Sequence, residues 1–233
     1  MKPSLRLASA ALAVALAAGA ALPALAATKP EFSKDETVYA VLEPDGSVRR
    51  TTVSEHLYNA SGLSNVTDHS TLTNIVNTES DAEFTQNGDA LTWNTTDTDV
   101  YYKGDTDRQL PISAAVTYTL DGVEKPLEEL LGQSGHLVVT VTLTNQTAEK
   151  LTVDGGERTI VTPFVTAVGV ILGQNASNVN AEHGLLESAA KSSVAAFVTL
   201  PGVREALDGL LPSSVSALED YLQDTVTVEA DVE

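Results

Sequence analysis

The chain has 233 residues, enough for one domain or two small ones, and its 32 acidic residues against 13 Lys plus Arg give a formal net charge of −19. A negative field of this size repels nucleic-acid phosphates and anionic lipid head groups, so we expect neither as a partner. The sequence has no cysteine, which excludes disulfides, thiolate nucleophiles and thiolate metal sites.

Residues 1–26 have the pattern of a secretory signal peptide. A positively charged start precedes an apolar segment rich in Ala and Leu, and Ala24 and Ala26 form a small-x-small pattern for cleavage before Ala27. The apolar segment is shorter than the ~20 residues that span a bilayer, which favours cleavage over an uncleaved anchor. We therefore expect an exported chain, secreted or held at the cell surface, with no membrane span in its mature part.

Residues 27–109 are expected to form an N-terminal β-rich part. Residues 34–50 predict a hairpin around a Pro-Asp-Gly turn, and residues 82–93 predict another around an Asn-Gly turn. Tyr101 and Tyr102 fall in a further short strand. Because neighbouring strand residues point to opposite faces, one of these tyrosines should be in the core.

The segment between the two hairpins is expected to be mostly irregular. Ser54 suggests the N-cap of a short helix that runs through Tyr58. Residues 59–80 are rich in Ser, Thr and Asn with weak periodicity, which predicts a loop containing one short element.

Residues 110–147 predict a strand, a tight turn, a short helix, a second turn and a strand. Both strands alternate between apolar and polar or Thr residues, the pattern of a sheet with one buried face. The first strand ends at the turn pair Asp121 and Gly122, Pro126 suits the first turn of the helix, and Gly132 suits its C-terminal cap. We expect this short helix to lie over one end of a β-sandwich or sheet, because it is too short to be stable alone.

The following segment combines apolar runs with turn residues. Residues 159–172 are β-branched and apolar, and Pro163 among them favours an edge strand or a bulge. Residues 178–200 fit either a helical face or strands around a His-Gly turn, and we favour strands.

The C-terminal segment closes the second part, residues 110–233. Short helical patterns cover residues 203–211 and 216–222, and residues 225–233 alternate as a strand. The chain stops within that strand pattern, so we expect the natural protein to continue past residue 233. The alternative to two parts is one continuous domain over residues 30–233 that is truncated at its C-terminal end.

Several short motifs follow one another in a fixed order along the chain. They are KDETVY at 34–39, QNGD at 86–89, YYKG at 101–104, YTLDG at 118–122, EELLGQSG at 128–135 and LPG at 200–202. In this order they resemble the N-terminal extracytoplasmic region of a group of uncharacterised, predicted surface or membrane proteins of Gram-positive bacteria. The resemblance covers nearly the whole mature chain and implies a location and a fold class, but no activity.

Four acidic residues form the best candidate for a ligand site. Asp97, Asp99, Asp105 and Asp107 flank residues 100–104, and hard oxygen ligands on a loop suit calcium. Their spacing matches no EF-hand loop, and the alternative is a solvated acidic turn.

The fold class expected from these patterns is α+β and predominantly β, with antiparallel, sandwich-like sheets and a few short helices. No Gly-x-Ser-x-Gly motif or Gly-rich phosphate loop occurs, and the four histidines lack metal-ligand spacing. We therefore expect a non-enzymatic module of the cell surface, structural or interacting, with an unknown extracellular protein or cell-wall partner and no cofactor except the calcium candidate. A carbohydrate- or calcium-binding extracellular module is the alternative, followed by a cryptic hydrolase.

Overall fold

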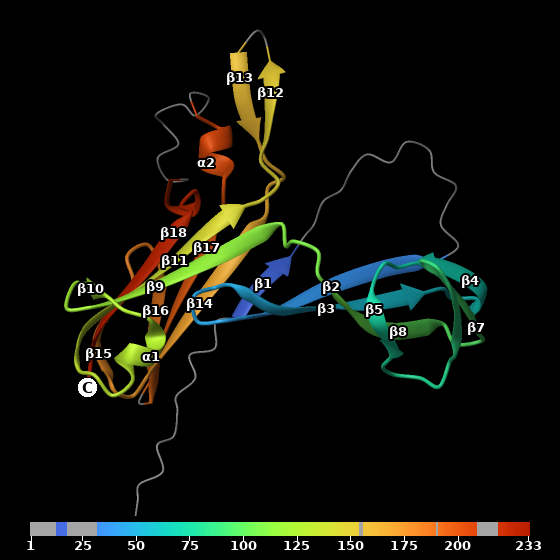
Figure 1. Cartoon of the computed structure of the whole chain (residues 1–233), viewed down its shortest axis with the longest axis horizontal. Coiled ribbons are helices and arrows are strands. Elements are labelled where there is room, and N and C mark those ends of the chain that lie inside the picture. Colours follow the sequence, from blue (N-terminus) through green and yellow to red (C-terminus); the bar gives the residue numbers. More distant parts are fainter. Residues whose placement is uncertain (1–12, 18–31, 154–155, 190, 209–218) are drawn as a thin grey trace, which may run out of the picture. The chain divides into compact units, whose positions relative to one another are not determined.

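The computed structural model describes residues 13–17, 32–153, 156–189, 191–208 and 219–233. It is built of antiparallel sheets, and its described helices are short (Figure 1). The predicted fold class, mostly β with a few short helices, is confirmed. The chain divides into two compact units: unit 1 comprises residues 1–19, 43–47 and 110–233, and unit 2 comprises residues 20–42 and 48–109.

Unit 2 contains two sheets that share one core. The first sheet has the order β2-β3-β8-β5, with β2 (Ser33–Leu42), β3 (Val48–Tyr58), β8 (Asp99–Thr106) and β5 (Thr73–Asn77). The second has the order β4-β7-β6, with β4 (Leu63–His69), β7 (Ala90–Thr95) and β6 (Phe84–Asn87). Inward residues of both sheets form one buried cluster: Leu57, Leu63, Val66, Leu91, Trp93, Val100 and Tyr102. As predicted, one of the two neighbouring tyrosines, Tyr102, lies in this core.

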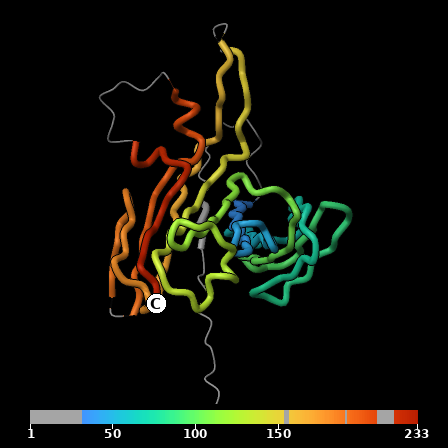
Figure 2. The backbone as a smooth tube through the Cα atoms, turned by 60° about the vertical axis from the view of Figure 1, so that its left-hand side comes forward, coloured from blue at the N-terminus to red at the C-terminus, as the bar shows by residue number. Residues whose placement is uncertain are grey.

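Unit 1 is a β-sandwich with an added two-stranded ribbon. One sheet has the order β10-β9-β11-β18-β15, with β10 (Val123–Glu124), β9 (Ile112–Leu120), β11 (Gly135–Asn145), β18 (Thr225–Val232) and β15 (Ala176–Asn180). The other has the order β1-β14-β17-β16, with β1 (Ala13–Ala17), β14 (Val165–Gly173), β17 (Ser192–Thr199) and β16 (Leu185–Ala189). The ribbon β12 (Glu149–Val153) and β13 (Gly156–Ile160) extends beyond both sheets (Figure 2).

The core of unit 1 follows directly from strand alternation. Every second residue of β9, β11 and β18 is buried against every second residue of β14 and β17. The buried cluster combines Val116, Val141 and Val228 from one sheet with Val168 and Phe197 from the other. The burial of these apolar side chains away from water is the main source of stability for a chain that has no disulfide bonds.

Two predictions for unit 2 are wrong. The expected helix from Ser54 to Tyr58 is the second half of β3, in which Leu57 and Glu55 point inward and pair across to β8. The expected loop at 59–80 contains β4 and β5. Their pairing with β7 and β8 outweighs the weak local propensity of their polar residues.

Several predictions for unit 1 are confirmed. Residues 178–200 are strands, and Asp121 and Gly122 form a tight turn with positive φ angles of 51° and 79°. The predicted helix at Pro126 is α1 (Leu127–Leu130), which buries none of its residues, so the expected lid is only one turn at the surface. The helix predicted from residue 203 is α2 (Val203–Ala206), and the one predicted at 216–222 lies partly outside the described residues.

The turn of the β2–β3 hairpin, residues 43–47, belongs to unit 1 and lies against β9. The Val116 amide donates to the Asp45 carbonyl oxygen at 2.8 Å, and the Tyr118 hydroxyl donates to the Pro44 carbonyl oxygen at 2.9 Å. Gly46 has a φ of +89°, and a Cβ built there would lie 2.3 Å from the Ala114 carbonyl oxygen. Only glycine combines this backbone conformation with so close an approach.

Part of the predicted signal peptide is described. Ala13–Ala17 form β1, which pairs antiparallel with β14. The predicted cleavage residues Ala24, Ala26 and Ala27 lie outside the described residues. Among the helices that the structure describes, none is long and apolar enough to cross a bilayer.

Candidate functional site

A group of ionisable side chains lies on the inner face of unit 2, and we call it the Lys34 cluster: Lys34, Glu55, Asp68 and Tyr102. Strand register brings it together. Lys34 on β2 stands opposite Leu57 on β3, and Glu55 stands opposite Tyr102 on β8, so all share the inward face of one sheet. Asp68 faces them from β4 of the second sheet.

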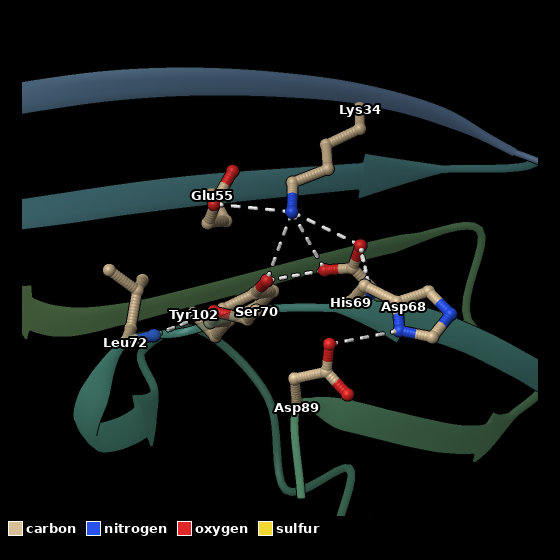
Figure 3. A network of polar contacts seen from close by, with 8 residues as sticks. All are labelled: Lys34, Glu55, Asp68, His69, Ser70, Leu72, Asp89 and Tyr102. Carbon is tan, nitrogen blue, oxygen red and sulfur yellow. Dashed lines mark hydrogen bonds and ion pairs between the residues drawn. The ribbon is translucent and has the colours of Figure 1, made fainter.

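The Lys34 amine is the centre of the cluster (Figure 3). Its Nζ lies 3.1 Å and 3.0 Å from Oδ1 and Oδ2 of Asp68, and 3.2 Å from Oε1 of Glu55. It also donates to the Tyr102 hydroxyl at 3.4 Å. The Tyr102 hydroxyl in turn donates to Oδ2 of Asp68, and the His69 amide donates to Oδ1 at 2.8 Å.

Both carboxylates of the cluster are buried. Glu55 is 3% exposed and Asp68 is 4% exposed, whereas the Lys34 side chain reaches in from the sheet edge and is 28% exposed. Trp93 packs on Tyr102 with ring centroids 5.6 Å apart and so forms an apolar wall. Oε2 of Glu55 is buried without a hydrogen-bond partner.

Burial controls the protonation of the cluster. It raises the pKa of Glu55 to about 7, against the opposing attraction of the Lys34 charge. Burial by itself lowers the pKa of Lys34, but its hydrogen bond to Asp68 and the charges of Glu55 and Asp68 together hold that pKa above its ordinary value. The pKa of the Tyr102 phenol is raised, first by burial and then by its hydrogen bond to Asp68. At neutral pH the cluster therefore contains an amine in contact with one carboxylate and with a second carboxyl group that readily gains or loses a proton.

Of this cluster the sequence indicates only Tyr102, as one of two tyrosines of which one is expected in the core, and it indicates no ionisable site at these positions. The residue that could have indicated a buried ionisable site is Glu55, because it occupies an inward position of β3 between the apolar residues Val53 and Leu57. Recognising it requires the segment to be read as a strand, and a helix was expected there instead. Lys34 and Asp68 carry no local signal, since charged residues near strand ends are usually solvated.

The structure spreads out the four residues of the calcium prediction. Asp99 contacts Nε2 of His56 at 2.8 Å, and Asp105 accepts a hydrogen bond from Thr52 at 3.1 Å. These two aspartates lie at opposite ends of β8, about 20 Å apart for an extended strand of that length. Asp97 and Asp107 lie just outside the two ends of that strand. Within the described ranges no three His, Cys, Asp or Glu side chains come close enough to hold a metal ion, and the calcium site stays a prediction.

The sequence also contains a Ser-x-x-Lys spacing at Ser188 and Lys191. In serine hydrolases such a pair supplies a nucleophile and a base. Here it falls at the β16–β17 hairpin, where the Ser188 hydroxyl lies 3.0 Å from the Ser193 hydroxyl. Nothing in this arrangement marks Ser188 as an activated nucleophile.

The two outer faces of the unit 1 sandwich differ in chemistry. The outer face of β9-β11-β18 is polar, and Thr117, Thr140 and Thr227 stand side by side on it. The outer face of β14-β17-β16, which we call the apolar face, carries paired or neighbouring small and branched apolar residues: Val165, Ala167, Ile171, Leu185, Val194, Ala196 and Val198. Ile171 is 53% exposed and Leu185 is 77% exposed.

Compared with models of known protein families, with curated proteins and with solved structures, the chain matches none of them.

Proposed function

We propose that the chain is an exported, non-enzymatic module of the cell surface that packs against another extracellular protein through the apolar face of unit 1. The observation that carries this proposal is the contrast between the two outer faces of one sandwich. A sandwich that meets only water normally has polar residues on both outer faces. One face fits that rule, and the apolar face does not.

The sequences of β14 and β17 support the same reading. Each strand is nearly continuous in apolar residues, as in VTAVGVILG of β14, which is typical of strands covered on both sides. In a chain with a net charge of −19, this face carries one acidic residue of β16, Glu187, which lies opposite Val194. Covering one half-exposed Val, Ile or Leu contributes about 1 kcal/mol. The apolar face has five such residues beside Ala167 and Ala196, which together form a substantial docking surface.

The pattern of residues 1–26 supports export, and its removal has a consequence for this surface. Cleavage before Ala27 takes β1 away and leaves β14 at the edge of its sheet. That edge has no charged residue to protect it against pairing with another strand. A partner that covers the apolar face can therefore also form hydrogen bonds with the backbone N–H and C=O groups at the edge of β14.

Site-specific photo-cross-linking in the native cells tests this proposal. A photoreactive amino acid at Val198 samples the apolar face, and one at Thr117 on the polar face of the same sandwich is the matched control. We expect a discrete protein adduct from position 198, recovered from the envelope or the medium, and none from position 117. Equal labelling from both positions, or a chain found only in the cytosol, would contradict the proposal.

A further inference from the structure

We propose that Lys34 and Asp68 become joined by an amide bond between Nζ and the side-chain carboxyl carbon, and that Glu55 carries the proton that this step must move. The reaction is a single event within one chain that needs no cofactor or second substrate. It cross-links β2 of one sheet to β4 of the other, and it is independent of the partner proposed for unit 1.

The first argument is the position of the amine. Nζ lies 3.1 Å and 3.0 Å from the two oxygens of the Asp68 carboxylate. Because it is almost equally far from both oxygens, the nitrogen is also close to the carboxyl carbon that joins them. Reaction between groups held at contact distance gains a large advantage over the same reaction in solution. Lys34 is attached at the sheet edge and Asp68 is held by the His69 amide and the Tyr102 hydroxyl, so both partners are fixed before the bond forms.

The second argument is that the cluster is poorly suited to be only an ion pair. Two buried carboxyl groups face one amine, and Oε2 of Glu55 has no hydrogen-bond partner. Burying charges costs free energy that an ion pair recovers only in part. An amide between Lys34 and Asp68 removes one positive and one negative charge from this interior, which leaves a neutral product.

The third argument is the state of Glu55. Burial raises the pKa of this carboxyl group to about 7, so near neutral pH it both accepts and gives up a proton. Its Oε1 contacts Nζ at 3.2 Å, and its second oxygen is free of other hydrogen bonds. Glu55 is therefore placed as a proton carrier for the nitrogen that attacks.

The reaction balances without any further reagent. One proton passes from the Lys34 ammonium to the Asp68 carboxylate, and the free amine then attacks the carboxyl carbon to form the C–N bond. The Tyr102 hydroxyl and the His69 amide each donate to one Asp68 oxygen and so stabilise the charge that develops there. Glu55 takes a second proton from the nitrogen and delivers a proton to the departing hydroxyl group. The C–O bond breaks, one water molecule leaves, and Glu55 returns to its starting state.

Such a bond supplies what the sequence otherwise lacks. A chain with no cysteine has no disulfide to restrain it outside the cell. Residues 34 and 68 are 34 positions apart, so the amide closes a long loop of unit 2. Unlike a disulfide, this cross-link is insensitive to reducing agents.

Mass spectrometry of the purified chain tests the proposal directly. We expect the unaltered chain to be lighter than its sequence by one water molecule under denaturing conditions. Trypsin does not cut after an acylated Lys34, so the peptide that ends at Arg49 should appear joined to the peptide of residues 51–103, which contains Asp68. An unaltered chain that keeps its full sequence mass and yields these peptides separately would overturn the proposal, whatever the variants do.

Matched variants assign the roles. Lys34→Arg keeps the positive charge and Glu55→Gln keeps the shape of the side chain, and both are expected to have their full sequence mass. Lys103→Arg, an exposed change on β8, should still lose the water. Loss of water in Lys34→Arg would point to cyclisation at an Asp-Gly pair such as Asp121-Gly122 and refute the cross-link, and loss in Glu55→Gln would refute the role of Glu55. Far-UV circular dichroism confirms that each variant is folded.

Discussion

Replacing Lys34 by arginine should destabilise unit 2 by about 4 kcal/mol. Arginine retains a positive charge beside Glu55 and Asp68, so the change removes the amine that forms the amide and little else. The cross-link closes a loop of 34 residues. By the chain-entropy relation for a covalently closed loop, restraining the unfolded chain over that length stabilises the folded state by about 4 kcal/mol.

The chain has one tryptophan, and this Trp93 is fully buried in unit 2. Its fluorescence during urea unfolding therefore reports unit 2 without a signal from unit 1. We expect the free energy of unfolding of Lys34→Arg to fall by about 4 kcal/mol, and that of Lys103→Arg to stay within about 0.5 kcal/mol of the unaltered chain. If mass spectrometry finds the amide and Lys34→Arg still unfolds at the same urea concentration as the unaltered chain, the loop-closure reasoning is wrong.

Three further predictions concern pH, backbone and core. Burial raises the pKa of Glu55 from its ordinary value of 4.5 to about 7, so the folded state binds more protons than the unfolded state in that window. In Lys34→Arg, which keeps a positive charge beside Glu55 and cannot form the amide, the free energy of unfolding of unit 2 should then fall by about 3 kcal/mol as pH rises through the window. Trp93 fluorescence should show a flatter pH dependence when Glu55→Gln is added to that variant. Gly122→Ala meets no atom within 4 Å and should cost about 1 kcal/mol for its positive φ. Gly46→Ala should cost clearly more, because its Cβ would press on β9, and equal thermal midpoints for the two variants by circular dichroism would contradict this. Leu143→Ala opens a cavity in the core of unit 1 and should cost about 2–5 kcal/mol in urea unfolding followed by circular dichroism, whereas Val194→Ala on the apolar face should cost less than about 1 kcal/mol.

The parts of the fold that the sequence predicts well are strands with one wet and one dry face. β9 and β11 alternate cleanly because Thr or small residues face water while Val and Leu face the sandwich core. The turn that follows β9 is also predictable, because Asp121 and Gly122 suit positive φ angles. In such segments the local pattern and the tertiary environment agree.

The Lys34 cluster was not predictable in this way, for a physical reason. Its four members come from four different strands. Lys34, Glu55 and Tyr102 reach the same face only because strands that are far apart in the sequence pair with one another. β4, which carries Asp68, has few apolar residues and is a strand because β7 pairs with it. Charged side chains look like surface residues until the register that buries them is known.

The turn at residues 43–47 also bears on how this protein could have been inherited. Residues 110–233 form most of unit 1, but they do not complete it. Without the turn, the Val116 amide and the Tyr118 hydroxyl of β9 lose the carbonyl oxygens to which they donate. Those oxygens belong to a hairpin encoded some seventy codons upstream, since Tyr118 and Pro44 are 74 positions apart. Recombination that exchanged the two units at a single breakpoint would separate the donors from their acceptors. Such a gene should therefore pass between genomes with both units together.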